Sequence, residues 1–299
     1  MHLNGVEIRD SFAEAFPMRC TRLVLTAADR RWAHTAAATM TGFATSVIAC
    51  GCEAAVEREL APEETPDGRP GMAVMIFAMS DRDLTKQLRN RVGQCVLTCP
   101  SAAAYAGLAT APRLPLGRAL RFFGDGFQSS KRIGQNRYWR VPVMEGEFLV
   151  EDMVGTAKGI GGGNFLILAT TADAARRAAE AAVAAIASLP GSILPFPGGV
   201  ARSGSKIGSR YKGLIASTND AYCPTLRSRT AATALPPECG SVLELVIDGL
   251  DEAAIDAATT AGVRAACAAG RDGGILAIDA GNYGGKLGPH HFHLRRLLA

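Results

Sequence analysis

The sequence predicts an α+β protein of two related lobes, each with a ferredoxin-like (split βαβ) fold and insertions. Two observations lead to this prediction. A strand–helix–strand pattern occurs twice in each half of the 299-residue chain, and a repeated βαβ unit is the ferredoxin-like order. Hydrophobic residues make up 48% of the chain, which is enough for a substantial core. We expect the lobes to cover residues 1–155 and 156–299.

The first half supplies the elements of one lobe in order. Asp29 marks the start of its first helix, and a loop rich in Pro, Asp and Gly at 61–71 separates its two βαβ units. A β-hairpin insertion is expected over about 111–151, where Asp125-Gly126 is a strong turn signal. The expected strands are 22–27, 45–49, 72–79 and 94–98, and the expected helices are 29–40 and 81–91.

The second half repeats this order. A turn with the sequence TAKGIGGG at 156–163 is the expected boundary between the lobes, and AGNYGGKLGPHHFHL closes the chain as a turn followed by an edge strand. The expected strands between them are 164–169, 193–196, 242–247 and 275–279, and the expected helices are 173–189 and 251–269.

A basic loop at 195–226 interrupts the second lobe. It is rich in Gly, Ser and Pro, no hydrophobic period runs through it, and it carries Arg202, Lys206, Arg210 and Lys212. Long irregular loops in compact domains are usually functional or disordered, and the apolar residues of this one favour order. Four cations beside Gly-rich backbone suit an elongated anion such as a phosphate or a polycarboxylate. A solvated loop without a ligand is the alternative.

Several polar residues stand where folding alone does not require them. Glu244 lies inside the apolar strand VLELVI, where a buried carboxylate costs several kcal/mol unless it is paired or protonated. Alternation could instead leave it on a solvated face. The polar residues of ASTNDAYCPT, and the asparagines of the GGNF and AGNY turns, are open to two interpretations as well, because Asx residues beside Gly are usually turn formers.

The sequence also excludes several classes of protein. The glycines of 159–163 precede a strand rather than a helix, so they are not a dinucleotide loop, and GVARSGSK at 199–206 departs from a phosphate loop. The histidines of HHFH lack an acidic or thiol partner, which argues against a metal site. The net charge of +4 is too small to indicate nucleic-acid binding. We find no membrane span and no export signal, and expect a cytoplasmic chain with eight reduced cysteines.

Eight blocks of sequence, in the same order and from residue 4 onward, resemble formylmethanofuran:tetrahydromethanopterin formyltransferases. They include the loops that folding alone leaves unexplained. The blocks are NGVEIRDSFAEAF, TGFATSVI, EETPDGRPG, FFGDGFQ, EGEFLVED, PFPGG…RSGSK, ASTNDAYCPT and AGNYGGKLG.

The resemblance implies two split βαβ lobes, a homotetramer with its active site in a cleft at a subunit interface, and transfer of a formyl group between formylmethanofuran and N5 of tetrahydromethanopterin. Both carriers are substrates, and neither a metal nor a prosthetic group is implied. The family's proposed catalytic carboxylate falls on Glu244. We expect the substrate-binding residues to be Arg202, Ser205, Lys206, Arg210, Lys212, Asn219, Asp220, Tyr222, Asn164 and Asn282.

The Arg- and Ala-rich composition resembles members from methylotrophic bacteria, which oxidise formaldehyde through this one-carbon route. There the enzyme is one subunit of a formyltransferase/hydrolase complex, so other subunits of such a complex are expected partners. A non-catalytic scaffold subunit that binds the carriers is the alternative. A ferredoxin-like nucleic-acid binder is a further alternative, but no pair of aromatic residues on a strand supports base stacking.

Overall fold

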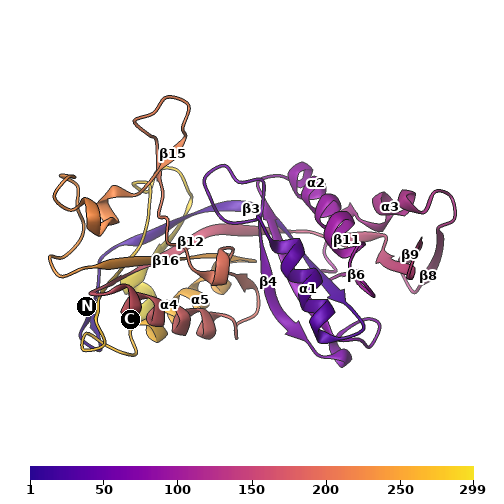
Figure 1. Ribbon diagram of the computed structural model, residues 1–299, viewed down its shortest axis with the longest axis horizontal. Coiled ribbons are helices and arrows are strands. Elements are labelled where there is room, and N and C mark those ends of the chain that lie inside the picture. The colour runs from indigo at the N-terminus through magenta and orange to yellow at the C-terminus, as the bar shows by residue number, and fades with distance from the viewer. The chain divides into compact units, whose positions relative to one another are not determined.

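A computed structural model describes residues 1–299 as two compact units (Figure 1). Unit 1 comprises Met1–Pro17, Ser46–Cys50 and Ile160–Ala299, and unit 2 comprises Met18–Thr45 and Gly51–Gly159. Two long strands, β3 (Phe12–Thr26) and β12 (Ala157–Ala169), contribute residues to both units. None of the helices has both the length and the apolar character that crossing a membrane requires.

Unit 2 contains one split βαβ fold. Its four strands lie in the order β4-β5-β3-β6, and every neighbouring pair is antiparallel. Helices α1 and α2 follow β3 and β5 and cover one face of the sheet, where Leu84 and Leu88 of α2 are fully buried. Each such leucine contributes roughly 1.5–3 kcal/mol of transfer free energy. The bounds are Arg30–Thr41 for α1, Glu53–Leu60 for β4, Gly71–Ala78 for β5, Asp81–Arg91 for α2 and Ala103–Ala106 for β6.

The start of α1 is set by the sequence as expected. The side chain of Asp29 accepts a hydrogen bond from the backbone N–H of Trp32 at 2.9 Å, and Ser80 does the same for Asp83 at the start of α2. Such caps satisfy N–H groups that have no partner within the helix, and each contributes about 0.5–2 kcal/mol.

Two strands expected in the first half of the chain are wrong. Residues 94–98 continue α2 as a π-helix, Val92–Val96, which buries Val92 and Val96 on the helical face, and the strand comes later as β6. Residues 45–49 form a loop that ends in a turn at 48–49, Val47 of this loop is half exposed, and β4 replaces the expected strand. In both places a short apolar run fits a helix or a turn as well as a strand.

The second part of the stretch expected to form a hairpin insertion consists of strands. Strands β8, β9 and β10 form an antiparallel meander, and β10 joins β6 in parallel. The stretch before them is helical rather than a hairpin, because Asp125 adopts a left-handed conformation (φ 49°) that ends a helical turn. The bounds are Arg113–Pro115 for β7, Gly117–Leu120 for α3, Arg121–Gly124 for η3, Ser129–Ile133 for β8, Asn136–Val143 for β9, Gly146–Glu151 for β10 and Met153–Gly155 for β11.

Unit 1 contains the second split βαβ fold. Its strands lie in the order β17-β12-β16-β13, all antiparallel, and β2 extends the sheet by pairing in parallel with β17. Helices α4 and α5 pack on one face of this sheet (Figure 1). The bounds are Val6–Ile8 for β2, Ala172–Ile186 for α4, Ser192–Ile193 for β13, Ser241–Gly249 for β16, Glu252–Ala266 for α5 and Ile275–Asp279 for β17.

The ends of the chain complete unit 1. Strand β1 (His2–Leu3) pairs with β2, and the expected terminal edge strand is β18 (His290–His293), which pairs with β3 before a last helix, α6 (Leu294–Leu298). The expected turn at 156–163 is wrong, because β12 runs through it with an irregularity between Ile160 and Gly163. The compact units therefore combine N-terminal segments with the C-terminal half, whereas the sequence-based division was placed between residues 155 and 156.

Candidate functional site

Glu244 lies on the face of the unit 1 sheet that the helices leave uncovered. Along β16 the side chains alternate, and Leu245 and Ile247 belong to the core beneath α4 and α5. Glu244 pairs across the strands with Leu166 of β12, which belongs to a smaller apolar cluster on the opposite face together with Leu235. The carboxylate is therefore held beside apolar side chains on that face.

The Glu244 carboxylate has no hydrogen-bond or ion-pair partner within the chain, and its side chain is only partly exposed. Burial raises its pKa to about 7. The sequence left open a buried and a solvated position, and the structure places the group between the two. Near neutral pH both protonation states are populated, so this carboxyl group is suited both to accept and to donate a proton.

The basic loop begins directly beside Glu244. Ala201 and Glu244 exchange two backbone hydrogen bonds, of 2.8 and 2.9 Å, in an isolated antiparallel bridge. Beyond Ala201 the chain forms a two-stranded ribbon from β14 (Lys206–Ile207) and β15 (Ala216–Ser217), which extends away from the sheet of unit 1 (Figure 1). The bridge fixes the root of the loop at the candidate catalytic carboxylate.

The cations of the loop fall into two groups. Lys206 forms an ion pair with Asp220, which also accepts a hydrogen bond from the Thr230 hydroxyl at 3.0 Å. The bond from Lys206, followed by that from Thr230, holds the pKa of Asp220 below its usual range. Lys206 and Asp220 thus fasten one part of the loop to another. The exposed side chains without such partners are Arg202, Ser205, Arg210 and Lys212.

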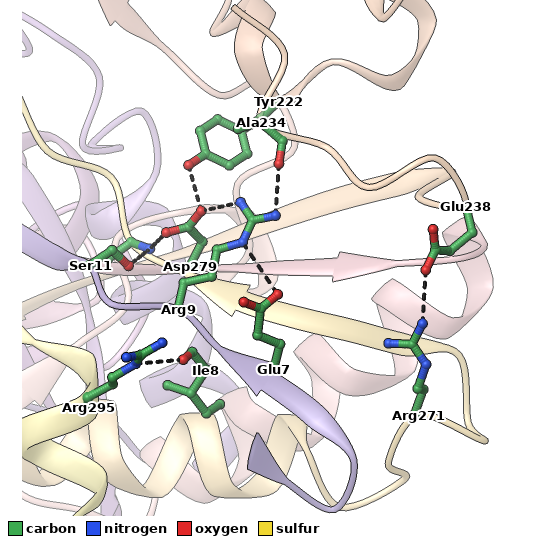
Figure 2. A network of polar contacts seen from close by, with 11 residues as sticks. Glu7, Ile8, Arg9, Ser11, Tyr222, Ala234, Glu238, Arg271, Asp279 and Arg295 are labelled. Atoms are coloured by element: carbon green, nitrogen blue, oxygen red, sulfur yellow. Dashed lines mark hydrogen bonds and ion pairs between the residues drawn. The ribbon is translucent and has the colours of Figure 1, made fainter. Parts of the chain in front are cut away.

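Tyr222 connects the far end of the loop to the sheet (Figure 2). Its hydroxyl donates to the Asp279 carboxylate at 2.8 Å, and Arg9 donates to the same oxygen at 2.6 Å and to the backbone oxygen of Ala234 at 2.8 Å. Burial and the nearby Asp279 raise the pKa of Tyr222. Burial opposes the charge of Arg9, but its bond to Asp279 raises the pKa overall.

This network shares a sheet face with Glu244. Leu166 is paired with Glu244 on one side and with Asp279 on the other, and directly paired residues project to the same face. Two strand spacings separate the two carboxylates' backbones, roughly 10 Å. Sequence reasoning missed Arg9 and Asp279, although an acidic residue at the end of the apolar strand ILAID is the same signal that singled out Glu244.

Asn164 and Asn282 use their amide groups within the fold. The Asn164 amide donates to the backbone oxygens of Gly162 and Gly281 and accepts from Gly281 at 2.6 Å. Asn282 donates to the oxygen of Phe12 and accepts from Gly284. Asn219, by contrast, has no side-chain hydrogen bond, and it lies near Gly204 in the basic loop. The substrate-binding roles of these asparagines stay predictions.

The AGNYGGKLG segment encloses a second unexpected carboxylate. Glu14 of β3 is 1% exposed and accepts four backbone N–H bonds, at 2.8 Å from Tyr283, 2.8 Å from Gly285, 2.5 Å from Leu287 and 2.6 Å from Gly288. Burial alone would raise the pKa of Glu14, but the four bonds together lower it. The segment is therefore shaped around an ionised carboxylate.

Two family models match nearly the whole chain. The model described as formylmethanofuran-tetrahydromethanopterin formyltransferase matches residues 1–143, and the model of the proximal lobe of the same family matches residues 146–297. The chain belongs to this formyltransferase family. The resemblance seen in the eight sequence blocks is thereby confirmed.

Relatives of this formyltransferase family match along their full length. The formylmethanofuran–tetrahydromethanopterin formyltransferase of Methylococcus capsulatus is 60% identical over 299 residues, which is 100% of each chain. A crystal structure of the formyltransferase/hydrolase complex of Methylorubrum extorquens with methylofuran matches with a TM-score of 0.96 at 52% identity, covering 100% of this chain and 99% of that one. The formyltransferase of Methanosarcina barkeri matches with a TM-score of 0.94 at 48% identity, covering 99% and 100%.

Proposed function

We propose that this chain is an acyltransferase that moves a formyl group between formylmethanofuran, or a bacterial analogue of it, and N5 of tetrahydromethanopterin. Both carriers act as substrates in one-carbon metabolism. The observation that carries the proposal, beyond family membership, is the Glu244 carboxyl group. It has no partner in the chain, its pKa is about 7, and it lies at the root of a basic loop.

The chemistry requires a group that can take up and return a proton. When the amine N5 attacks the formyl carbon, a tetrahedral adduct forms and the nitrogen must lose a proton. Glu244 accepts this proton and then donates it to the methanofuran nitrogen as that carbon–nitrogen bond breaks, which restores the carboxylate. Proton transfer by a positioned side chain contributes about 10²–10⁴ in rate.

The transfer we propose is direct, within a ternary complex of the two carriers and the enzyme. The adduct's oxyanion needs a donor in a place sheltered from water. Asn219 is our candidate, because its side-chain amide makes no hydrogen bond within the chain. Lys206 is less suited, since its ammonium group is already paired with Asp220.

The exposed cations of the loop are free to bind the anionic parts of the carriers. Arg202, Arg210 and Lys212 have no ion-pair partner in the chain, and all three are exposed. Such guanidinium and ammonium groups bind carboxylates and phosphates through charge-assisted hydrogen bonds. We therefore assign them to carrier binding rather than to the chemical step.

The test is formyl transfer by the purified chain, followed by the absorbance change on forming N5-formyl-tetrahydromethanopterin. Glu244→Gln should lower kcat by at least about 10². The matched control is Glu180→Gln, which removes an exposed carboxylate of α4 that pairs with Arg176 and should leave turnover unchanged. Near-normal turnover by Glu244→Gln would refute the role of this residue.

We further propose that the chain assembles as a homotetramer in the cytoplasm and joins other subunits of a formyltransferase/hydrolase complex. The loop supports an interface, because Tyr211, Leu214 and Ile215 are 75%, 57% and 58% exposed. Light scattering of the purified chain measures its mass in solution and so tests the homotetramer. A chain that binds the carriers but transfers no formyl group, alone or with the other subunits, would instead be a scaffold.

A further inference from the structure

Two adjoining cavities in the hairpin insertion of unit 2 are strongly basic. Their volumes are about 320 and 360 Å³, and they share Arg118, Arg137 and Asp152 in their walls. Volumes of this size are typical of the smaller ligand sites in proteins. The arginines that line one or both cavities are Arg113, Arg118, Arg121, Arg132 and Arg137.

The acidic residues of the cavities neutralise only part of this charge. Arg118 pairs with Asp152 at 3.0 Å, and Arg113 pairs with Glu151 at 3.2 Å. No other acidic side chain lines either cavity. Three of the five guanidinium groups are therefore left without a carboxylate.

The two carboxylates that line the cavities, Glu151 and Asp152, are each held in place by a further hydrogen bond. Asp152 accepts a hydrogen bond from the indole N–H of Trp139 at 2.7 Å, and Glu151 accepts one from the backbone N–H of Ala106 at 2.9 Å. Both acids are buried, at 5% and 3% exposure. Neither can swing out to pair with the remaining arginines.

The remaining arginines are held without a charged partner. The guanidinium group of Arg121 lies 4.6 Å from the ring centre of Trp139 and 4.7 Å from that of Phe122, so aromatic faces support its position. Arg137 donates to the hydroxyl of Ser130 at 2.7 Å. The side chain of Arg132 is exposed and has no hydrogen-bond or ion-pair partner in the chain.

We propose that these cavities bind a compact multivalent oxyanion, either an organic phosphate or a polycarboxylate. Several guanidinium groups around one concave site match the paired oxygens of such anions, because each presents a planar fork of N–H donors. Mutual repulsion of the unpaired arginines is relieved when the anion enters. The site is built only from residues of unit 2 and does not depend on the function proposed for Glu244.

The test is isothermal titration calorimetry of the full chain at low ionic strength with pyrophosphate and, separately, with citrate. Saturable binding that weakens as salt is added is expected for at least one probe. The probe that binds identifies the ligand as phosphate or polycarboxylate. Arg132→Gln/Arg137→Gln should weaken binding at least tenfold, since it removes two cations, together with the contact between Arg137 and the Trp139 ring, and leaves the hydrogen bond between Trp139 and Asp152 intact.

The matched control is Arg140→Gln, which lies on the same strand as Arg137 but pairs with Glu147 and lines neither cavity. It should bind the probe like the unaltered chain. Absence of binding by both probes, equal binding by Arg132→Gln/Arg137→Gln, or loss of binding in Arg140→Gln would each overturn the proposal.

Discussion

The enclosed carboxylate of Glu14 offers a sharp test of how the AGNYGGKLG segment is held. Glu14→Gln keeps the size of the side chain but replaces one acceptor oxygen by an NH₂ group. That oxygen accepts two backbone N–H bonds, either from Tyr283 and Gly285 or from Leu287 and Gly288. The substitution therefore leaves two backbone N–H groups without an acceptor and places them against the NH₂ group of the glutamine, which is itself a donor.

The magnitude follows from these contacts. Leaving a buried donor without its acceptor costs about 1–3 kcal/mol, so two such donors predict a loss of about 2–6 kcal/mol in the stability of the segment. Hydrogen–deuterium exchange of peptides covering 280–288 measures this loss directly, and thermal unfolding measures its effect on the whole fold. Glu7→Gln is the control, because the Glu7 side chain is 47% exposed.

The same contacts predict the pH dependence. The folded pKa of Glu14 lies below its unfolded value, so its contribution to stability is fully present above the unfolded pKa and is lost as the pH falls through the folded one. Exchange protection of 280–288 should then decline in acid in the unaltered chain but not in Glu14→Gln. Unchanged protection in the variant at neutral pH would refute this account of the segment.

Three further outcomes are expected. Burial raises the pKa of Glu244 to about 7 in the folded chain. The contribution of the protonated group to the free energy of unfolding is therefore present below the ordinary pKa of a glutamate and is lost as the pH rises through 7. Glu244→Gln should thus have a higher melting temperature than the unaltered chain at pH 8 but not at pH 4. Tyr222→Phe removes a bond to the Asp279 carboxylate and should cost about 1.5–3 kcal/mol in unfolding, with a raised KM. Arg202→Ala should raise KM far more than it lowers kcat, and the reverse pattern in steady-state kinetics would assign it to the chemical step.

Local sequence patterns predicted the helices well and the short strands less well. Helices α2 and α5 begin with capping residues and keep one apolar face, so their positions follow from the sequence. The apolar run at 94–98 was assigned to a strand, but it completes the buried face that α2 begins. The choice between a strand and a helix at these residues depends on how the apolar face packs against the sheet, and a short window of sequence does not contain that information.

The candidate site shows the same limit. Glu244 was predicted because a charge inside an apolar strand is visible in the sequence itself. Arg9 and Asp279 were not, because their ion pair joins residues 270 positions apart. Glu14 was missed for a similar reason, since its partners are backbone N–H groups at the other end of the chain.

The distribution of the chain between the two units has a consequence for synthesis on the ribosome. Unit 2 is complete once residue 159 has emerged, whereas unit 1 joins residues 1–17 to strands and loops that are made last. The first strands must wait for β17 and β18, their pairing partners near the C-terminus. We expect unit 2 to fold during translation and unit 1 only after release, so a chain truncated before β17 should leave its N-terminal segment open to proteases.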